Sequence, residues 1–189
     1  GPESVKTSEM VRDNMLGKLG VDMKSITYNM ATGYGRVLVP FAHENVSEIS
    51  AHAKGAHWYF PSVRTILDMG CQDCKAINVN DKGQVTKFIM NDKCAGGTGR
   101  FLELIASVLG LRLEDIGQMS LESKKTFPFN TVCAVFAKSE AVSLMKKGTD
   151  KADILAGLHD AIAVRCYNLL KRVNIEKDFT ITGGIAKNI

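Results

Sequence analysis

Two cysteines stand just before stretches with helical periodicity, where a thiolate can ligate a metal. Cys94 precedes a glycine-rich stretch at 95–99, and Cys133, 39 positions later, precedes an apolar pattern that begins at Ala134. The dipole of a helix N-terminus stabilises negative charge, including that of a thiolate. A cysteine-held iron–sulfur cluster needs four thiolates, so two per chain suggest a site shared across a twofold axis. We therefore predict Cys94 and Cys133 as ligands of such a cluster.

The glycine-rich stretch after Cys94 also predicts an anion site. Gly97, Thr98 and Gly99 open a well-patterned helix. Free N–H groups at such a helix start attract phosphate, and a nucleotide phosphate is one such anion. The alternative is a glycine-rich loop beside a buried thiol, because free cysteine often behaves as a small core residue.

A second group of polar residues lies where an apolar strand, predicted over 64–70, enters a turn. Asp68 at the strand end can hold Mg²⁺, and Gly70 lets backbone N–H groups approach phosphate oxygens. Gln72 or Asp73 can orient the attacking water that phosphoryl transfer needs. An ordinary structural turn is the alternative, because Asp-x-Gly is a common turn sequence.

A glycine pair, Gly183-Gly184, closes the last predicted strand at 178–182. Glycine at that position lets a flat ring approach the backbone, so we predict an adenosine-binding turn. The remaining cysteines are Cys71, Cys74 and Cys166. An odd total of five without a signal segment argues against a disulfide framework. Cys71-x-x-Cys74 has no second pair to complete a zinc ribbon, and Cys166 lies within a long helix, so we expect structural or incidental roles.

The elements that position these residues follow from hydrophobic periodicity. Helices are predicted over 3–20, 46–59, 98–109, 113–120, 134–147 and 150–173, the last capped by Asp150. Strands are predicted over 25–31, 64–70, 75–80, 84–90 and 178–182, with a hairpin turn at 81–83. Three strands followed by helices and another strand indicate an α/β or α+β fold with a meander. A domain boundary is predicted near 61–65.

Composition narrows the class of protein. Lys and Arg number 24 against 20 Asp and Glu, and this mild net charge of +4 is spread out, which argues against a nucleic-acid partner. No apolar run is long enough to span a bilayer and no signal segment opens the chain, so we expect a cytoplasmic protein. Gly1-Pro2 resembles the scar left by protease removal of an expression tag, and the chain stops at Ile189 where a helix is expected, which together indicate a fragment.

Several stretches resemble the BadF/BadG/BcrA/BcrD ATPase family. This family contains the activators of 2-hydroxyacyl-CoA dehydratases and the ATPase subunits of benzoyl-CoA reductases. The similarity extends over residues 5–188, and the stretches that carry it are 31–36, 47–49, 68–75, 91–101, 133–140 and 182–188. The run Asn91-Asp92-Lys93-Cys94 is the most specific of them, whereas the glycine turns alone are not specific.

The resemblance implies an α/β fold, the actin-like (ribonuclease H-like) ATPase fold, with a mixed sheet and helices on both faces. Residues 1–64 would be a partial first subdomain, and 65–189 a second, cluster-bearing ATPase subdomain. Family members open with a strand and a glycine-rich phosphate turn, and no such segment precedes residue 5, so we expect a truncated copy of the fold.

The resemblance also implies a function. Two subunits, as a homodimer or heterodimer, would share one [4Fe-4S] cluster held by Cys94 and Cys133. ATP binding and hydrolysis with Mg²⁺ would drive a low-potential electron from reduced ferredoxin or flavodoxin to an acyl-CoA reductase or dehydratase component. Nucleic acid and membrane would not be partners. The resemblance also places three groups of residues near the nucleotide. The phosphate segment would hold Asp68, Gly70, Gln72 and Asp73. The adenosine segment would hold Gly183 and Gly184, and the helix start would hold Gly97, Thr98 and Gly99.

Two positions depart from the family pattern. Cys71 stands where the family typically has glycine, so its side chain is expected to crowd the phosphate turn. Cys74 favours the aryl-CoA reductase subunits, because activators more often carry serine there. The alternative functions are a metal-free actin-like kinase or nucleotide sensor, and a non-catalytic fragment that does not hydrolyse ATP.

Overall fold

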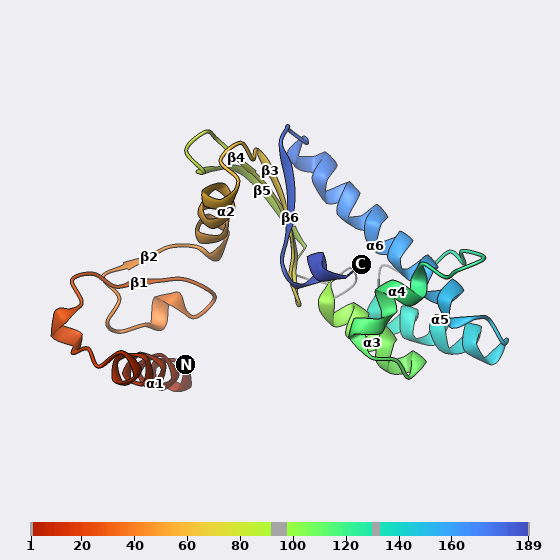
Figure 1. Ribbon diagram of the computed structural model, residues 1–189, viewed down its shortest axis with the longest axis horizontal. Helices are drawn as coiled ribbons and strands as arrows, with labels where there is room; N and C mark the ends of the chain where they lie inside the picture. Colours follow the sequence, from red (N-terminus) through yellow and green to blue (C-terminus); the bar gives the residue numbers. More distant parts are fainter. Residues whose placement is uncertain (1, 92–97, 130–132, 189) are drawn as a thin grey trace. The chain divides into compact units, whose positions relative to one another are not determined.

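The computed structural model describes residues 2–91, 98–129 and 133–188 (Figure 1). The chain divides into two compact units, Gly1–Gly55 and Ala56–Ile189. The division falls within helix α2, Glu48–Tyr59, a few residues before the boundary predicted near 61–65. The assignment of 1–64 and 65–189 to two subdomains of an ATPase stays a prediction.

The first unit holds little regular structure beyond its opening helix. It comprises α1 (Pro2–Leu19), two short 3-10 helices at Met23–Ser25 and Arg36–Leu38, the strands β1 (Met30–Ala31) and β2 (Glu44–Asn45), which pair in parallel, and the start of α2. The strand predicted over 25–31 is therefore wrong except at its last two residues. Asp22 explains part of the difference, because its carboxylate accepts a hydrogen bond from Lys24 N and turns the chain into a 3-10 helix.

The second unit is built on a four-stranded mixed sheet. Its strands are β3 (Thr65–Met69), β4 (Cys74–Val79), β5 (Val85–Asn91) and β6 (Phe179–Thr182), in the order β5-β4-β3-β6. The first three form the predicted antiparallel meander, with Gly83 at φ +70° in the hairpin turn. β6 pairs in parallel with β3, so the helices between β5 and β6 serve as the crossover that a parallel pair needs.

Four helices make this crossover. They are α3 (Gly99–Leu109), α4 (Ile116–Ser120, preceded by a 3-10 turn at Leu113–Asp115), α5 (Ala134–Lys146) and α6 (Lys151–Val173). All four were predicted, and the Asp150 cap on α6 is confirmed by its hydrogen bond from Ala152 N at 2.8 Å. α6 contacts α4 and α5 as well as β4 and β5, so it joins the helices to the sheet (Figure 1). A final 3-10 helix at Gly184–Lys187 follows β6.

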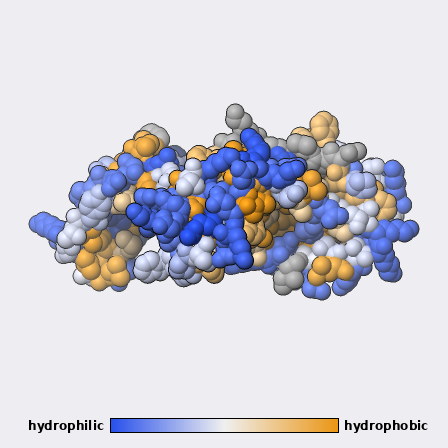
Figure 2. Space-filling view, turned by 90° about the horizontal axis from the view of Figure 1, so that it is seen from above, coloured by the Kyte–Doolittle hydropathy of each residue, from blue (hydrophilic) through white to orange (hydrophobic). Residues whose placement is uncertain are grey.

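One apolar core lies between the sheet and the helices. Its members come from β3, β4 and every crossover helix, and they include Leu67, Ala76, Phe101, Ile105, Ala137 and Leu158. On the face seen in Figure 2, hydrophobic residues lie in separate patches among hydrophilic ones. Within the described ranges, no helix combines the length and the apolar character that a membrane span requires.

Candidate functional site

The turn between β3 and β4 is closed by a backbone hydrogen bond and leaves little room for a side chain at Gly70. Gly70 N donates to Asp73 O at 2.9 Å. A Cβ atom on Gly70 would lie 3.1 Å from both the carbonyl oxygen and Oδ1 of Asp73, closer than most side chains tolerate. We call residues 70–73 the phosphate turn, since the sequence predicts that role for them.

Three charged side chains are buried beside the phosphate turn. Asp68, Asp73 and Lys75 are only 8%, 9% and 5% exposed. Lys75 forms an ion pair with Asp73, and its Nζ lies 3.6 Å from Asp68 Oδ2. Two carboxylates and one ammonium carry a net charge of −1, so this group suits a divalent cation when one is bound. The sequence argument missed Lys75, although a lysine within an otherwise uncharged predicted strand was a visible signal.

The Asp68 carboxylate also faces the last strand. Asp68 is opposite Lys75 on β4 and opposite Thr182 on β6, so three polar residues form a row across the sheet. Thr182 Oγ1 donates to Asp68 Oδ1 at 3.4 Å. The row places a carboxylate at the edge where strands β3 and β6 both end.

Gly183 brings the predicted adenosine turn against the end of β3. It has φ +91°, and a Cβ atom there would lie 2.4 Å from Met69 O and 2.9 Å from Asp68 Oδ1. No side chain fits such a contact, so glycine is required by both conformation and space. Gly184 begins the following 3-10 helix and has no atom within 4 Å of its Cβ position.

The start of α3 is attached to the phosphate turn. Gly99 N donates to Gly70 O at 3.0 Å, and Arg100 N donates to Cys71 O at 2.8 Å. The prediction of free N–H groups for an anion is therefore wrong at these two positions, because turn carbonyls already accept from them. Thr98 precedes the helix and is fully buried, and Gly97 lies outside the described residues.

These three segments meet around a cavity of about 340 Å³. Gly70 and Cys71 line it from the phosphate turn, Gly99 from α3, and Gly184 from the predicted adenosine turn. Gln72 is exposed on the same turn. The lining residues that sequence reasoning did not predict are Leu102, Glu103, Leu113, Glu114, Ile185, Lys187 and Asn188. The volume falls within the range of small-molecule sites.

His159 of α6 holds one wall residue of this cavity. Its Nε2 lies 2.7 Å from Asn188 Nδ2, and its Nδ1 lies 2.8 Å from Leu155 O. Burial lowers the pKa of His159, so the ring is neutral near pH 7, donates from Nδ1 and accepts from the Asn188 amide.

The cysteines differ in their surroundings. Cys133 is half-buried at the N-cap of α5, as predicted, and Cys94 lies outside the described residues. Cys74 and Cys166 are buried with their sulfurs 3.8 Å apart, which confirms the expected core role of Cys166. The hydrogen bond to Cys166 and burial raise the pKa of the Cys74 thiol, so it stays protonated. Cys71 is exposed.

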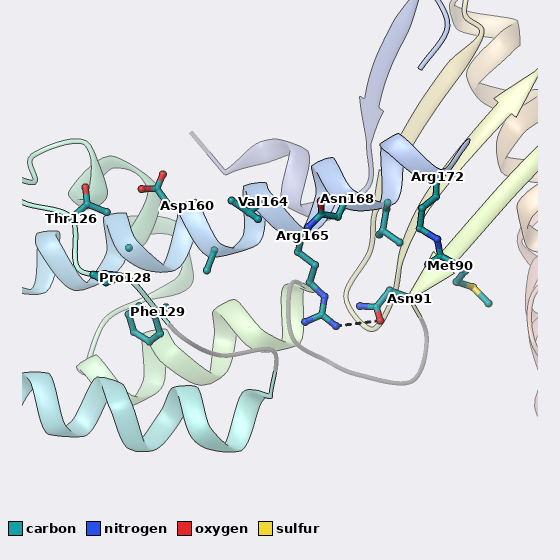
Figure 3. A pocket seen from close by; sticks show the side chains of 13 residues that line it. Met90, Asn91, Thr126, Pro128, Phe129, Asp160, Val164, Arg165, Asn168 and Arg172 are labelled. Atoms are coloured by element: carbon teal, nitrogen blue, oxygen red, sulfur yellow. Dashed lines mark hydrogen bonds between the residues drawn. The ribbon is translucent and has the colours of Figure 1, made fainter. Parts of the chain in front are cut away.

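Cys133 opens a helix whose first residues are exposed and apolar. Val135 and Phe136 are 69% and 68% exposed, whereas Ala137 and Ala141 are buried. α5 packs against α3, and both helices begin on the same side of the pair (Figure 3). Among the described residues, no three His, Cys, Asp or Glu side chains gather into a metal site.

A larger cavity of about 710 Å³ lies between the end of β5, residues 126–129 and α6 (Figure 3). Arg165 Nη2 donates to Asn91 Oδ1 across it at 3.3 Å. The segment at Phe127 lies against Gly157 of α6, and a Cβ atom on Gly157 would lie 1.8 Å from Phe127 O. Among the predicted site residues that the structure describes, none lines this cavity, so the smaller one is the candidate site.

The mixed sheet, the crossover helices and the glycine turns at the strand ends define an actin-like ATPase fold. The activator of 2-hydroxyisocaproyl-CoA dehydratase from Clostridium difficile, solved with bound ADPNP, superposes with a TM-score of 0.83 at 36% identity, covering 95% of this chain and 67% of that one. The predicted fold class is confirmed.

The chain belongs to the BadF/BadG/BcrA/BcrD ATPase family, whose profile matches residues 3–189. The activator of lactoyl-CoA dehydratase from Anaerotignum propionicum is 45% identical over 169 residues, covering 89% of this chain and 65% of the relative. A benzoyl-CoA reductase component from Thauera aromatica is 31% identical over 182 residues, covering 96% and 64%. The chain thus spans about 65% of the relative from Anaerotignum propionicum. The identity is higher to this activator than to the reductase component, and the preference drawn from Cys74 stays a prediction.

Proposed function

We propose that the protein containing this chain binds and hydrolyses ATP in order to deliver a low-potential electron from a [4Fe-4S] cluster to a 2-hydroxyacyl-CoA dehydratase component. The observation that carries this proposal is the meeting of the phosphate turn, the start of α3 and Gly183-Gly184 around one cavity. The ADPNP bound to the Clostridium difficile activator supports nucleotide binding by this chain.

The residues around the cavity take distinct roles in this proposal. Asp68 would hold Mg²⁺, which neutralises phosphate charge when bound. Gln72 is exposed on the phosphate turn and would orient the attacking water. Asp73 is engaged by Lys75, so it shapes the turn rather than activating water. Gly70 and Gly184 would admit phosphate and adenosine close to the backbone.

The cluster part of the proposal depends on Cys133 and Cys94. Cys133 is half-buried, stands at a helix N-terminus and is followed by exposed apolar side chains that a second subunit would cover. Cys94 is five positions before Gly99, and α3 begins on the same side as α5 (Figure 3). Two thiolates from each of two subunits would complete the four that a [4Fe-4S] cluster needs, and the cluster would supply one-electron transfer.

The partners follow from the same reasoning. The second subunit would be another copy of the chain or a related ATPase subunit, and reduced ferredoxin or flavodoxin would donate the electron. The acceptor would be a dehydratase component, with an aryl-CoA reductase as the alternative, because relatives of both kinds match the chain.

The nucleotide part is tested by filling the cavity. Gly184→Leu places a large side chain where no atom lies within 4 Å, so the fold should persist while ADPNP affinity falls at least about tenfold by calorimetry. Gly55→Leu is the matched control, since its Cβ position is equally open and Gly55 lines neither cavity. Equal ADPNP affinity in the two variants would place the nucleotide elsewhere.

The cluster part is tested by anaerobic reconstitution with iron and sulfide. The unmodified chain should turn brown, Cys133→Ala should lose the visible absorption, and Cys166→Ala should keep it, because Cys166 is a core thiol. A colourless product that still binds ADPNP would favour the metal-free kinase or nucleotide sensor.

A further inference from the structure

Lys75 is a buried cation in a strand whose other residues are nearly all uncharged and buried. All six residues of β4 are buried, and Lys75 is 5% exposed. Burying an ammonium group is costly unless carboxylates compensate it, and Asp73 and Asp68 do so here. An apolar side chain would fill this strand position at no desolvation cost, so the contacts of the Lys75 ammonium group are worth following.

The ion pair between Lys75 and Asp73 reaches the phosphate turn. Lys75 pairs with Asp73 Oδ1, and the same oxygen is only 3.1 Å from the Cβ position of Gly70. The Asp73 side chain is thus held over Gly70, while Asp73 O accepts from Gly70 N. The ammonium group therefore fixes both the side chain and, through it, the closed form of residues 70–73.

The phosphate turn in turn holds the beginning of α3. Gly70 O and Cys71 O accept from Gly99 N and Arg100 N, the first two N–H groups of the helix. A Cβ atom on Gly99 would lie 3.1 Å from Cys71 Cα, so the two backbones are in contact. A shift of the turn must therefore move the start of α3 or break these hydrogen bonds.

We propose that Lys75 is a positioning residue that fixes the phosphate turn through Asp73 and thereby fixes the first turn of α3. The proposal rests on the proposed function, because it explains how a nucleotide phosphate bound at this turn would change the position of the helix that follows the Cys94 segment. A Mg²⁺ ion that draws Asp68 or Asp73 away from Lys75, or a phosphate that draws the Lys75 ammonium away from them, changes the same contacts that hold Gly99 and Arg100.

Hydrogen exchange of the 189-residue chain tests this inference without nucleotide or iron. Lys75→Met should speed exchange of the Gly99 and Arg100 amides about tenfold or more, while amides in the middle of α6 keep the rate of the unmodified chain. Lys75→Arg keeps a cation beside Asp73 and should restore slow exchange. Should Lys75→Met fail to fold, Asp73→Asn removes the same ion pair and carries the same expectation.

A pair of variants at Arg100 tests the route. Arg100→Pro removes the N–H that binds Cys71 O at a first-turn position where proline is tolerated, and Arg100→Ala keeps that N–H. Adding Lys75→Met should have its full effect on Gly99 exchange in the Arg100→Ala background and little further effect in Arg100→Pro, because the two changes break one connection.

Three results would overturn the inference. The first is an unchanged exchange rate of the Gly99 amide in Lys75→Met. The second is an equal rise in exchange rate throughout α6, which would mark a merely structural lysine. The third is a Lys75→Met effect on Gly99 exchange that is as large in the Arg100→Pro background as in the Arg100→Ala background. A chain that fails to bind ADPNP but shows the expected exchange pattern would reject the proposed function and keep this inference. A chain that binds ADPNP but lacks the expected exchange pattern would keep the proposed function and reject this inference.

Discussion

The phosphate turn and the approach to Cys133 are built on different principles. The phosphate turn is held by buried charges and by glycines that lie against backbone atoms, so its partners all lie within the chain. The approach to Cys133, residues 124–129 and 133–136, is fastened at its base to α6 and ends in exposed apolar side chains.

The two sites therefore differ in whether their side chains already have partners within the chain. At the phosphate turn each buried charge has a compensating partner, so the turn keeps its shape without a ligand. At the start of α5 Cys133 is half-buried, and the side chains of Val135 and Phe136 are exposed. The second arrangement is the one expected where a subunit-bridging group would bind.

Gly183→Ala, at the phosphate-turn site, should give the largest loss of stability. The added Cβ atom would lie 2.4 Å from Met69 O at a φ of +91°, so both strain and overlap oppose it. We expect a loss on the order of 3 kcal/mol or more in the free energy of unfolding, measured by urea denaturation. Gly184→Ala is the control and should stay close to the unmodified chain, because its Cβ position is open. Equal stability of the two variants would refute the close approach.

Gly157→Ala should disturb the approach to Cys133 by an intermediate amount. Within a helix this change normally stabilises by about 0.5–1 kcal/mol. Here the Cβ atom would lie 1.8 Å from Phe127 O, so we expect a loss of about 1–2 kcal/mol instead. Urea denaturation gives the sign directly, and a gain in stability would show that residues 127–129 do not pass so close to α6.

Asp153 should give the smallest effect, confined to acid pH. Hydrogen bonds from the backbone N–H groups of Lys125 and Lys124 hold the pKa of Asp153 below its ordinary value of 3.8. Its stabilising contribution is therefore complete above that ordinary value and is lost as pH falls through the lowered pKa. The difference in urea midpoint between the unmodified chain and Asp153→Asn should be present at pH 7 and shrink below about pH 4. A difference that does not change with pH would show that the carboxylate charge is not what holds residues 124 and 125.

Most of the second unit could be predicted from local patterns. The apolar spacing of α3, the Asp150 cap and the hairpin at Gly83 are each set by residues close together in the sequence. The strand predicted over 25–31 failed because β2 pairs with only Met30 and Ala31, and no periodicity reveals how far a pairing extends.

The candidate site could be predicted in its residue types but not in its contacts. Asp68, Gly70 and Gly183-Gly184 were identified by turn chemistry and by resemblance, and they do lie together. The engagement of Asp73 by Lys75 and the use of the first two α3 amides were not foreseen. The narrow passage at Gly157 was not foreseen either, because its partner Phe127 lies 30 residues earlier.

The sequence by itself determined the helices and strands of the second unit, the turns that contain glycine, and the family to which the chain belongs. Only the tertiary structure decided which polar groups are still available to a ligand. The reason is physical: a group that already forms a hydrogen bond or an ion pair within the chain is not available to a ligand, and its partner can lie far away in the sequence. Gly99 N and Gly70 O are one such pair.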